Sequence, residues 1–198
     1  MRADLEIIQN WIQPDSHVLD LGCGDGTLMH ALTQRHQVKG YGLEYDDLNI
    51  ISCIEKDVNV IQVDLDQGLS DLFDDHSFDY VIMTQTLQAM QRPDRLLKEM
   101  LRVGREGIVT FPNFGHWKSR TQLSFGGFMP VTKALPNTWY NTPNIHLCTV
   151  RDFEQFCRDN NIRILQRMVV DTSHQSSFLI KMFPNLLGEI ALYRISNG

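Results

Sequence analysis

Three glycines alternate with other residues near the start of the chain, in the stretch Asp20-Leu21-Gly22-Cys23-Gly24-Asp25-Gly26. An apolar run precedes this stretch and a helical pattern follows it, so the glycines belong to a turn between a strand and a helix. Because glycine has no Cβ atom, a ligand can approach the backbone amides of such a turn beside the start of the helix. The stretch therefore predicts a site for a nucleotide-like cofactor.

The spacing of these glycines distinguishes two classes of cofactor. The dinucleotide fingerprint G-x-G-x-x-G needs a glycine where this chain has Thr27. A pyrophosphate favours helix amides without a neighbouring carboxylate. S-adenosylmethionine instead carries an ammonium group, which needs a carboxylate such as Asp20, and a carboxylate, which tolerates the amides. The turn therefore favours S-adenosylmethionine or S-adenosylhomocysteine over NAD. We also prefer a ligand-binding turn to a glycine-rich turn that serves only close packing.

Two further acidic residues come at the ends of predicted strands. Glu44 lies 22 residues after Gly22, at the end of the second strand, where a carboxylate accepts both ribose hydroxyls. Asp64 ends the third strand and precedes Leu65, which suits an acceptor for the adenine amino group followed by an amide that meets the ring. Strand ends of an open parallel sheet share one edge, where ligands bind. We therefore expect these residues and Asp20 to form one cofactor site.

The elements that must hold these residues alternate along the chain. Apolar runs predict seven strands, at 17–21, 38–43, 59–63, 78–83, 107–111, 162–170 and 188–195. Helices are predicted at 5–12, 27–35, 46–56, 93–103 and 150–159, the last with Thr149 as N-cap. This alternation predicts an α/β fold with a mostly parallel seven-stranded sheet and helices on both faces. Only a loop, 171–187, separates the last two strands, so we expect an antiparallel last strand.

The segment at about 112–148 interrupts this alternation and is predicted to be a loop-like insertion. It is rich in Gly, Pro, Asn and aromatic residues, as is usual for a lid or a binding surface. Between Pro112 and Val150 there are three basic residues and no carboxylate, which indicates a surface for an anionic ligand or an acidic partner. By contrast, residues 42–79 hold eleven carboxylates and one basic residue, Lys56, and are interpreted as a solvated face.

The overall composition excludes several classes of protein. A length of 198 residues predicts a single domain over 1–198, and a net charge of −6 argues against nucleic-acid binding. There is neither a membrane-length apolar run nor a signal peptide pattern. Four cysteines without C-x-x-C spacing are interpreted as reduced thiols of a cytoplasmic protein. No metal site is predicted, because His116, His146 and His174 match no ligand spacing.

With these residues, the chain from about Leu5 to Phe111 resembles the class I S-adenosylmethionine-dependent methyltransferases, which have a Rossmann-like fold. The resemblance implies that Gly26 packs the helix against the sheet and that Thr84-Gln85-Thr86 closes over the methionine moiety. It also implies the role of each cofactor-binding residue. The predicted cofactor-binding residues are Asp20, Gly22, Cys23 (through its amide), Gly24 and Thr84 for the methionine end, Glu44 for the ribose, and Asp64 and Leu65 for the adenine.

The insertion carries a more specific signature. Its motifs include Phe111-Pro112-Asn113-Phe114-Gly115-His116-Trp117, Met129-Pro130-Val131-Thr132 and Trp139-Tyr140-Asn141-Thr142-Pro143. With the glycine turn, they closely resemble the bacterial MetW family of methionine biosynthesis, nearly end to end. The resemblance implies a homoserine O-acyltransferase as partner, which the chain helps to activate, and no established methyl acceptor. Because aromatic and Arg side chains anchor interfaces, Trp117, Arg120, Trp139 and Tyr140 are the candidate contacts.

Three functions remain open at this point. The fourth strand ends in Met83-Thr84-Gln85-Thr86-Leu87 and lacks the Asn/Asp-Pro-Pro-aromatic motif of amino-group methyltransferases. A general base must then come from the insertion, where His116, Tyr140 and His146 are candidates with ordinary structural alternatives. We therefore favour a regulatory subunit that binds S-adenosylmethionine. The alternatives are a methyltransferase acting on an unidentified small molecule and, less favoured, an NAD-dependent oxidoreductase.

Overall fold

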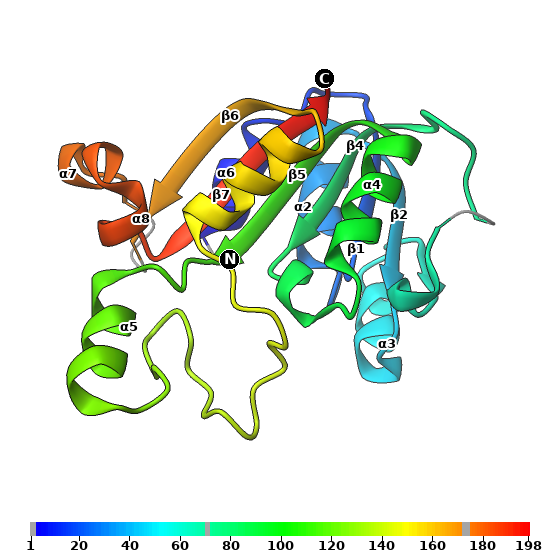
Figure 1. The fold of residues 1–198 in the computed structure, drawn as a ribbon. Coiled ribbons are helices and arrows are strands. Elements are labelled where there is room, and N and C mark those ends of the chain that lie inside the picture. Colours follow the sequence, from blue (N-terminus) through cyan, green and yellow to red (C-terminus); the bar gives the residue numbers. More distant parts are fainter. Residues whose placement is uncertain (1–2, 70–71, 172–174) are drawn as a thin grey trace.

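The computed structural model describes residues 3–69, 72–171 and 175–198. Seven strands form one sheet in the order β3-β2-β1-β4-β5-β7-β6 (Figure 1). The strands are β1 His17–Leu21, β2 Lys39–Glu44, β3 Val60–Gln62, β4 Phe78–Thr84, β5 Gly104–Pro112, β6 Ile162–Val170 and β7 Ile190–Asn197. Only β7 runs antiparallel to its neighbours, β5 and β6. The predicted α/β fold, its mostly parallel seven-stranded sheet and its antiparallel last strand are confirmed.

Alternate residues of the central strands face two separate cores, because successive side chains of a strand point to opposite faces. On one face, Val18 and Ile82 pack with helices α1 (Ala3–Gln9) and α2 (Thr27–His36). On the other, Leu19 and Val81 pack with α4 (Pro93–Val103) and α6 (Val150–Asp159). Figure 1 shows α4 and α6 in front of the sheet and α2 behind it, so helices cover both faces as expected.

Local sequence sets where these helices begin. The Thr149 hydroxyl and the Asp152 carboxylate form a capping box at the start of α6, which confirms the predicted N-cap. Pro93 occupies the first turn of α4, where its missing N–H costs nothing. Helix α3 (Asp47–Glu55) begins after Asp46, whose side chain accepts from the Asn49 amide at 3.0 Å. Of these helices, α3 begins directly after β2, the strand that ends at Glu44.

Two predicted loops contain helices. The segment 171–187 includes α7 (Phe178–Met182) and α8 (Pro184–Leu187), so the expectation of a plain loop was wrong. The hydroxyl of Ser177 accepts from the Ile180 amide and caps α7, and His174 lies outside the described residues. The insertion contains α5 (Trp117–Thr121) followed by one π-helical turn, η3 (Gln122–Gly126). Short 3₁₀ turns, η1 (Leu65–Gln67) and η2 (Leu87–Ala89), follow β3 and β4.

One buried side chain, Asn113, ties both ends of the insertion to the sheet. Its Nδ2 donates to the carbonyl oxygens of Asn185 at 3.1 Å and Gly188 at 2.8 Å. Its Oδ1 accepts from the amides of Gly115 at 3.0 Å and Val150 at 3.2 Å. Asn113 thus joins the end of β5, the base of the insertion, the start of α6 and the segment before β7.

Candidate functional site

A pocket of about 390 Å³ opens at the carboxyl ends of β1 and β4. It brings together five of the predicted cofactor-binding residues, namely Asp20, Gly22, Cys23, Gly24 and Thr84. Leu5, Asp25, Thr27 and Leu28 complete its lining. Asp20 is 1% exposed, so water would screen little of its attraction to a cationic group bound in the pocket. The pocket therefore offers a buried carboxylate beside the glycine turn, which suits the ammonium group of S-adenosylmethionine.

The three glycines of the turn have different surroundings, although all have positive φ, at 71°, 56° and 75°. A Cβ atom at Gly22 would lie 2.7 Å from Oγ1 of Thr86, and one at Gly26 would lie 2.8 Å from Sγ of Cys53. A Cβ atom at Gly24 would meet no described atom within 4 Å. Gly22 and Gly26 therefore allow close packing, as expected for Gly26, whereas Gly24 exposes its backbone to the pocket.

The carboxylate of Glu44, at the end of β2, connects the glycine turn to α3. Its Oε2 accepts from the Gly24 amide at 2.8 Å. Its Oε1 accepts from the amides of Tyr45 at 2.9 Å and Asp46 at 3.0 Å. Each carboxylate oxygen accepts about two hydrogen bonds, so capacity for a ribose hydroxyl remains. Glu44 does not line the 390 Å³ pocket but contacts Gly24, which does.

The structure does not bring the predicted adenine-binding residues into this pocket. The Asp64 carboxylate accepts from the Asp66 amide at 3.0 Å and caps η1. Leu65 is buried in the core that contains α4. Both residues follow Val63, whose amide donates to the Glu44 carbonyl at 2.9 Å. They therefore lie at the neighbouring strand end, beyond Glu44, and their role toward adenine stays a prediction.

Sequence reasoning missed the partner of Asp25. The Asp25 carboxylate accepts from Nζ of Lys56 at 2.6 Å and from the Thr27 hydroxyl at 2.8 Å. The hydrogen bond from Lys56 is the main reason that the pKa of Asp25 is lowered. The available signal was the position of Lys56 as the one basic residue between Gly42 and Asp79. This ion pair holds the turn against the end of α3.

Cys23 is no nucleophile in this structure. Burial, together with the negative charge of Asp20, raises the pKa of its thiol, which stays protonated at neutral pH. The sulfur lies 3.8 Å from Sγ of Cys53. A Cβ atom at Gly42 would overlap the Cys23 sulfur, so Gly42 makes the room that this side chain needs. The interpretation of Cys23 as a small packing residue agrees with these contacts.

A short segment after β4 links the pocket to the insertion. Gln85 has a φ of 54°, which is uncommon for a residue with a side chain, and its amide donates to the Thr110 carbonyl at 2.9 Å. The Gln88 carbonyl accepts from the amides of Ile145 and His146, both at 2.9 Å. Thr84, at the start of this segment, lines the pocket. One segment of five residues thus contacts both the predicted cofactor site and the insertion.

None of the three candidate general bases of the insertion lines the pocket. His116 is buried and caps α5, and burial lowers its pKa, so it is neutral at pH 7. His146 hydrogen-bonds the Gln91 carbonyl at 3.3 Å. Tyr140 is exposed and packs edge-on against Trp139, with ring centroids 5.6 Å apart. In the described parts of the chain, these residues have structural or surface roles.

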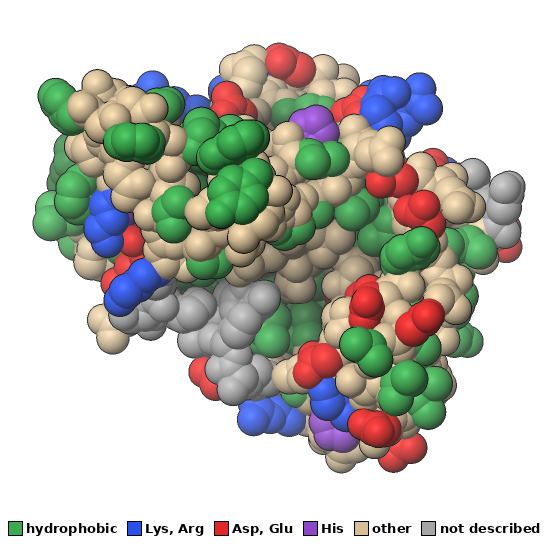
Figure 2. All heavy atoms as spheres, turned by 90° about the horizontal axis from the view of Figure 1, so that it is seen from below, with side chains coloured by type: hydrophobic (Ala, Val, Ile, Leu, Met, Phe, Trp, Pro, Cys, Tyr) green, Lys and Arg blue, Asp and Glu red, His purple; other side chains and the backbone are tan. Residues whose placement is uncertain are grey.

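The insertion presents a wide apolar surface. Trp139 is 75% exposed, and Phe125 on η3 is 89% exposed. Trp117 is also exposed, and Nε of Arg120 donates to the Gly115 carbonyl at 2.6 Å. Figure 2 shows hydrophobic side chains gathered with basic ones over this part of the molecule. The candidate contact residues of the insertion are therefore all accessible to a partner.

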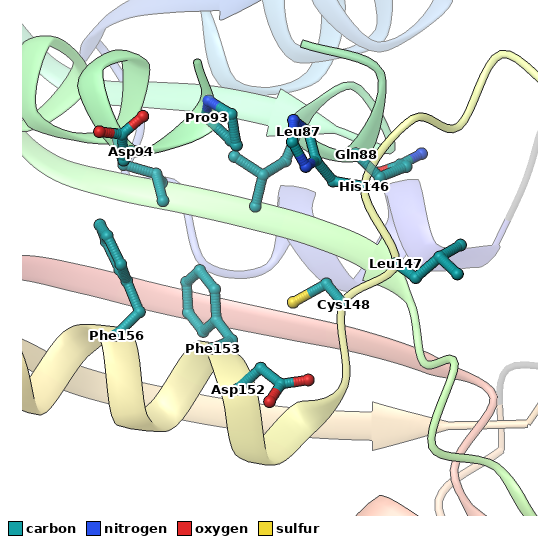
Figure 3. A pocket seen from close by; sticks show the side chains of 11 residues that line it. Leu87, Gln88, Pro93, Asp94, His146, Leu147, Cys148, Asp152, Phe153 and Phe156 are labelled. Atoms are coloured by element: carbon teal, nitrogen blue, oxygen red, sulfur yellow. The ribbon is translucent and has the colours of Figure 1, made fainter. Parts of the chain in front are cut away.

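A second pocket, of about 200 Å³, lies between α4 and α6. Leu87 and Pro93 face Phe153 and Phe156 across it, and Cys148 closes one end (Figure 3). Burial raises the pKa of the Cys148 thiol to about 12. This pocket is mainly apolar and is separate from the glycine turn.

The described residues contain no cluster of three or more acidic, His or Cys side chains arranged to hold a metal ion. Across the same residues, no helix has both the length and the apolar character needed to cross a membrane.

Comparisons with solved structures give the fold. An S-adenosylmethionine-dependent methyltransferase from Archaeoglobus fulgidus aligns over 98% of this chain and 91% of its own, with a TM-score of 0.71 and 15% identity. One from Mesorhizobium loti covers 98% and 97%, with a TM-score of 0.71 and 14% identity. The [4+2]-cyclase SpnF covers 99% and 81%, with a TM-score of 0.69 and 16% identity. Because one of these proteins is named a cyclase, the fold alone does not define the reaction.

Comparisons of sequence give the family. The model of the family described as "Methionine biosynthesis protein MetW" matches residues 2–195. The "Bifunctional methionine biosynthesis protein MetXA/MetW" of Rhodopirellula baltica (strain DSM 10527 / NCIMB 13988 / SH1) is 34% identical over 201 residues, which is 97% of this chain. The chain spans only 32% of the length of that relative. The chain belongs to the MetW family of methionine biosynthesis proteins and has the Rossmann-like fold of class I S-adenosylmethionine-dependent methyltransferases.

Proposed function

We propose that this chain binds S-adenosylmethionine or S-adenosylhomocysteine and acts in the cytoplasm as the partner and activator of a homoserine O-acyltransferase. The observation that carries the partner is the bifunctional relative, whose name joins MetXA and MetW in one chain. Two domains joined in one chain are held at a high effective concentration relative to each other, which favours their association. We infer the same association with a homoserine O-acyltransferase for this chain.

The cofactor assignment depends on the pocket at the glycine turn. Buried Asp20 attracts the ammonium group, and the open space beside Gly24 accommodates the carboxylate. Glu44, already bonded to the Gly24 amide, accepts from the ribose. Asp64 and Leu65 then meet the adenine beyond Glu44. The chain supplies binding and orientation, and S-adenosylmethionine when bound supplies a methyl group on a sulfonium.

The link from Thr84 to Gln88 suggests regulation. Thr86 packs against Gly22 of the pocket, and Gln88 holds Ile145 and His146 of the insertion. A ligand that changes the position of this segment changes the surface on which the acyltransferase docks, through Trp117, Arg120, Trp139 and Tyr140. Such a coupling would let the downstream product of methionine report the state of the pathway.

The second candidate is a methyltransferase that acts on an unidentified small molecule. The open 390 Å³ pocket favours it. Against it stands the lining of that pocket, where Asp20 and Asp25 are the side chains available as bases and each has another role. Turnover of S-adenosylmethionine by the purified chain in the presence of cell metabolites would support this second function.

The deciding experiment measures homoserine O-acyltransferase activity of the cognate enzyme with and without this chain, across a titration of S-adenosylmethionine. We expect the chain to raise the rate and Glu44→Ala to remove the dependence on the cofactor. Asp74→Ala, an exposed carboxylate before β4, is the control for loss of one negative charge. An unchanged rate at high chain concentration would exclude the activating role.

The docking residues are tested separately. Trp139→Ala with Tyr140→Ala should weaken activation, because both rings are exposed and pack on each other rather than in the core. Binding of S-adenosylhomocysteine should stay as in the wild type. Loss of cofactor binding in this variant would show instead that the two rings belong to the ligand site.

A further inference from the structure

Helix α3 carries apolar residues on its exposed side. Of its nine residues, Cys53 alone is buried, and it contacts the glycine turn. Leu48 is 74% exposed and Ile54 is 63% exposed, and Ile51 between them is exposed as well. Positions spaced by three lie on one side of a helix. An exposed Leu/Ile row of this kind usually marks a surface that another molecule covers.

Acidic side chains surround this row. Asp47, Glu55 and Asp57 are all exposed beside it, within the stretch 42–79 that has eleven carboxylates and one basic residue. We use the name α3 surface for Leu48, Ile51 and Ile54 with these acids. A molecule that fits it must combine apolar side chains with positive charge.

The insertion of the same chain has that complementary chemistry. Trp117, Trp139 and Tyr140 are exposed on it, and its charged residues are Lys118, Arg120 and Lys133. No carboxylate occurs from Pro112 to Val150. One chain therefore carries both an apolar acidic surface and an apolar basic one.

The two surfaces lie on the same side of the molecule. In Figure 1 the insertion and α3 both extend below the sheet, at its carboxyl edge, and the view from below in Figure 2 shows them together. Two copies that meet through this side about a twofold axis place each insertion on the other copy's α3 surface. Such a contact is closed and formed twice, which is the common arrangement of homodimers.

We propose that two copies of this chain form a twofold symmetric dimer, in which the insertion of each copy covers the α3 surface of the other. The dimer covers the edge of the sheet that holds the 390 Å³ pocket. An acyltransferase that docks on the insertion competes with this self-association. The proposal does not depend on that enzyme, because it is tested in its absence.

The test is sedimentation velocity of the purified full chain over a range of concentrations. The wild type should sediment as a dimer of the 22.8 kDa chain. Leu48→Asp with Ile51→Asp, and separately Trp139→Ala with Tyr140→Ala, should each raise the dissociation constant by about tenfold or more. Leu165→Ser, which changes an exposed leucine of β6, is the matched control and should dissociate as the wild type does.

Mixing the two defective variants gives the sharper result. Each variant alone lacks both contacts of the dimer, but a mixed pair keeps one intact contact, between the unchanged α3 surface of one copy and the unchanged insertion of the other. Association should therefore partly recover in the mixture. Leu48→Ser with Ile51→Ser is the milder substitution, should the two aspartates disturb α3.

Three results would overturn the proposal. The wild type would sediment as a monomer throughout, the α3 variant would dimerise normally, or the mixture would not recover. The second result would indicate that insertions pair with each other. Activation of the acyltransferase by a monomeric wild type would leave the proposed function intact and exclude only the dimer.

Discussion

Replacing Gly24 and Gly26 by alanine, one at a time, separates ligand contact from packing within the glycine turn. Both residues have left-handed backbone, with φ of 56° and 75°, which costs about 1–2 kcal/mol for a residue with a Cβ atom. At Gly24 the added methyl group meets no described atom within 4 Å. Gly24→Ala should therefore lower the free energy of unfolding by only about 1–2 kcal/mol.

Gly26→Ala carries an additional cost. Its methyl group would lie 2.8 Å from Sγ of Cys53 and 3.3 Å from Cγ2 of Val58. Forcing a methyl group into packed side chains adds about 1–3 kcal/mol. The total loss in the free energy of unfolding is then about 2–5 kcal/mol.

Ligand binding should be weakened more by Gly24→Ala than by Gly26→Ala, which is the reverse of the order expected for stability. Gly24 lines the 390 Å³ pocket, and a methyl group there would meet no described atom within 4 Å. We expect this group to occupy ligand space and to weaken binding of S-adenosylhomocysteine by about tenfold or more. Gly26→Ala, measured where it is fully folded, should bind within a few-fold of the wild type. Gly127→Ala is the control, because Gly127 has a φ of 66° and open space but lies in the insertion.

Urea unfolding followed by circular dichroism gives the stabilities, and isothermal titration calorimetry gives the affinities. If Gly24→Ala binds S-adenosylhomocysteine as the wild type does, the open side of the turn does not face the ligand. If Gly26→Ala is no less stable than Gly127→Ala, the packing explanation for Gly26 is wrong.

Four further predictions are tested by ligand binding, by urea unfolding or by thiol alkylation. Glu44→Ala should weaken binding of S-adenosylmethionine by about 10- to 150-fold, since a hydrogen bond to a charged group contributes roughly 1.5–3 kcal/mol; unchanged affinity would exclude a ribose contact. Asn113→Ala should cost about 2–4 kcal/mol in urea unfolding, because it removes three buried hydrogen bonds and one part-buried hydrogen bond to backbone groups; a loss below about 1 kcal/mol would contradict its role at the base of the insertion. The pKa of Asp25 is lowered, so its pair with Lys56 stabilises the fold above the usual carboxyl range and is lost as pH falls through the lowered pKa; Lys56→Met should therefore be destabilised at pH 7 and match the wild type in strong acid, and a deficit independent of pH would contradict this. Alkylation of Cys23 by iodoacetamide should be about 100-fold slower in the native protein than in urea, because burial raises the pKa of its thiol; fast modification would mean that the turn opens readily.

The site was predictable where neighbouring residues in the chain decide it. Asp20, Gly22 and Gly24 lie within one turn, and the strand before that turn is apolar enough to be buried. Thr84 meets them because β4 is the parallel neighbour of β1, which the resemblance to methyltransferases implied. Local pattern and known fold together therefore gave five residues of the pocket.

Other contacts depend on residues far apart in the chain. Asn113 bonds residues 72 and 75 positions away, and no local pattern predicts such partners. The position of β7 in the sheet, between β5 and β6, is likewise one of several possible strand orders. Asp64 and Leu65 stand at the expected strand end, yet their side chains serve a 3₁₀ cap and a core. Hydrogen bonding and burial within the folded chain decided these roles.

The sequence by itself determined the alternation of strands and helices, the glycine turn with its acidic neighbours, and the acid-free aromatic insertion. These features follow from periodicity, backbone freedom and charge, which neighbouring residues carry. Tertiary structure alone decided which strand ends share the pocket, that Glu44 bonds the Gly24 amide, and that the insertion and α3 extend on one side. Those outcomes depend on how the sheet is ordered and on which distant groups meet once water is excluded.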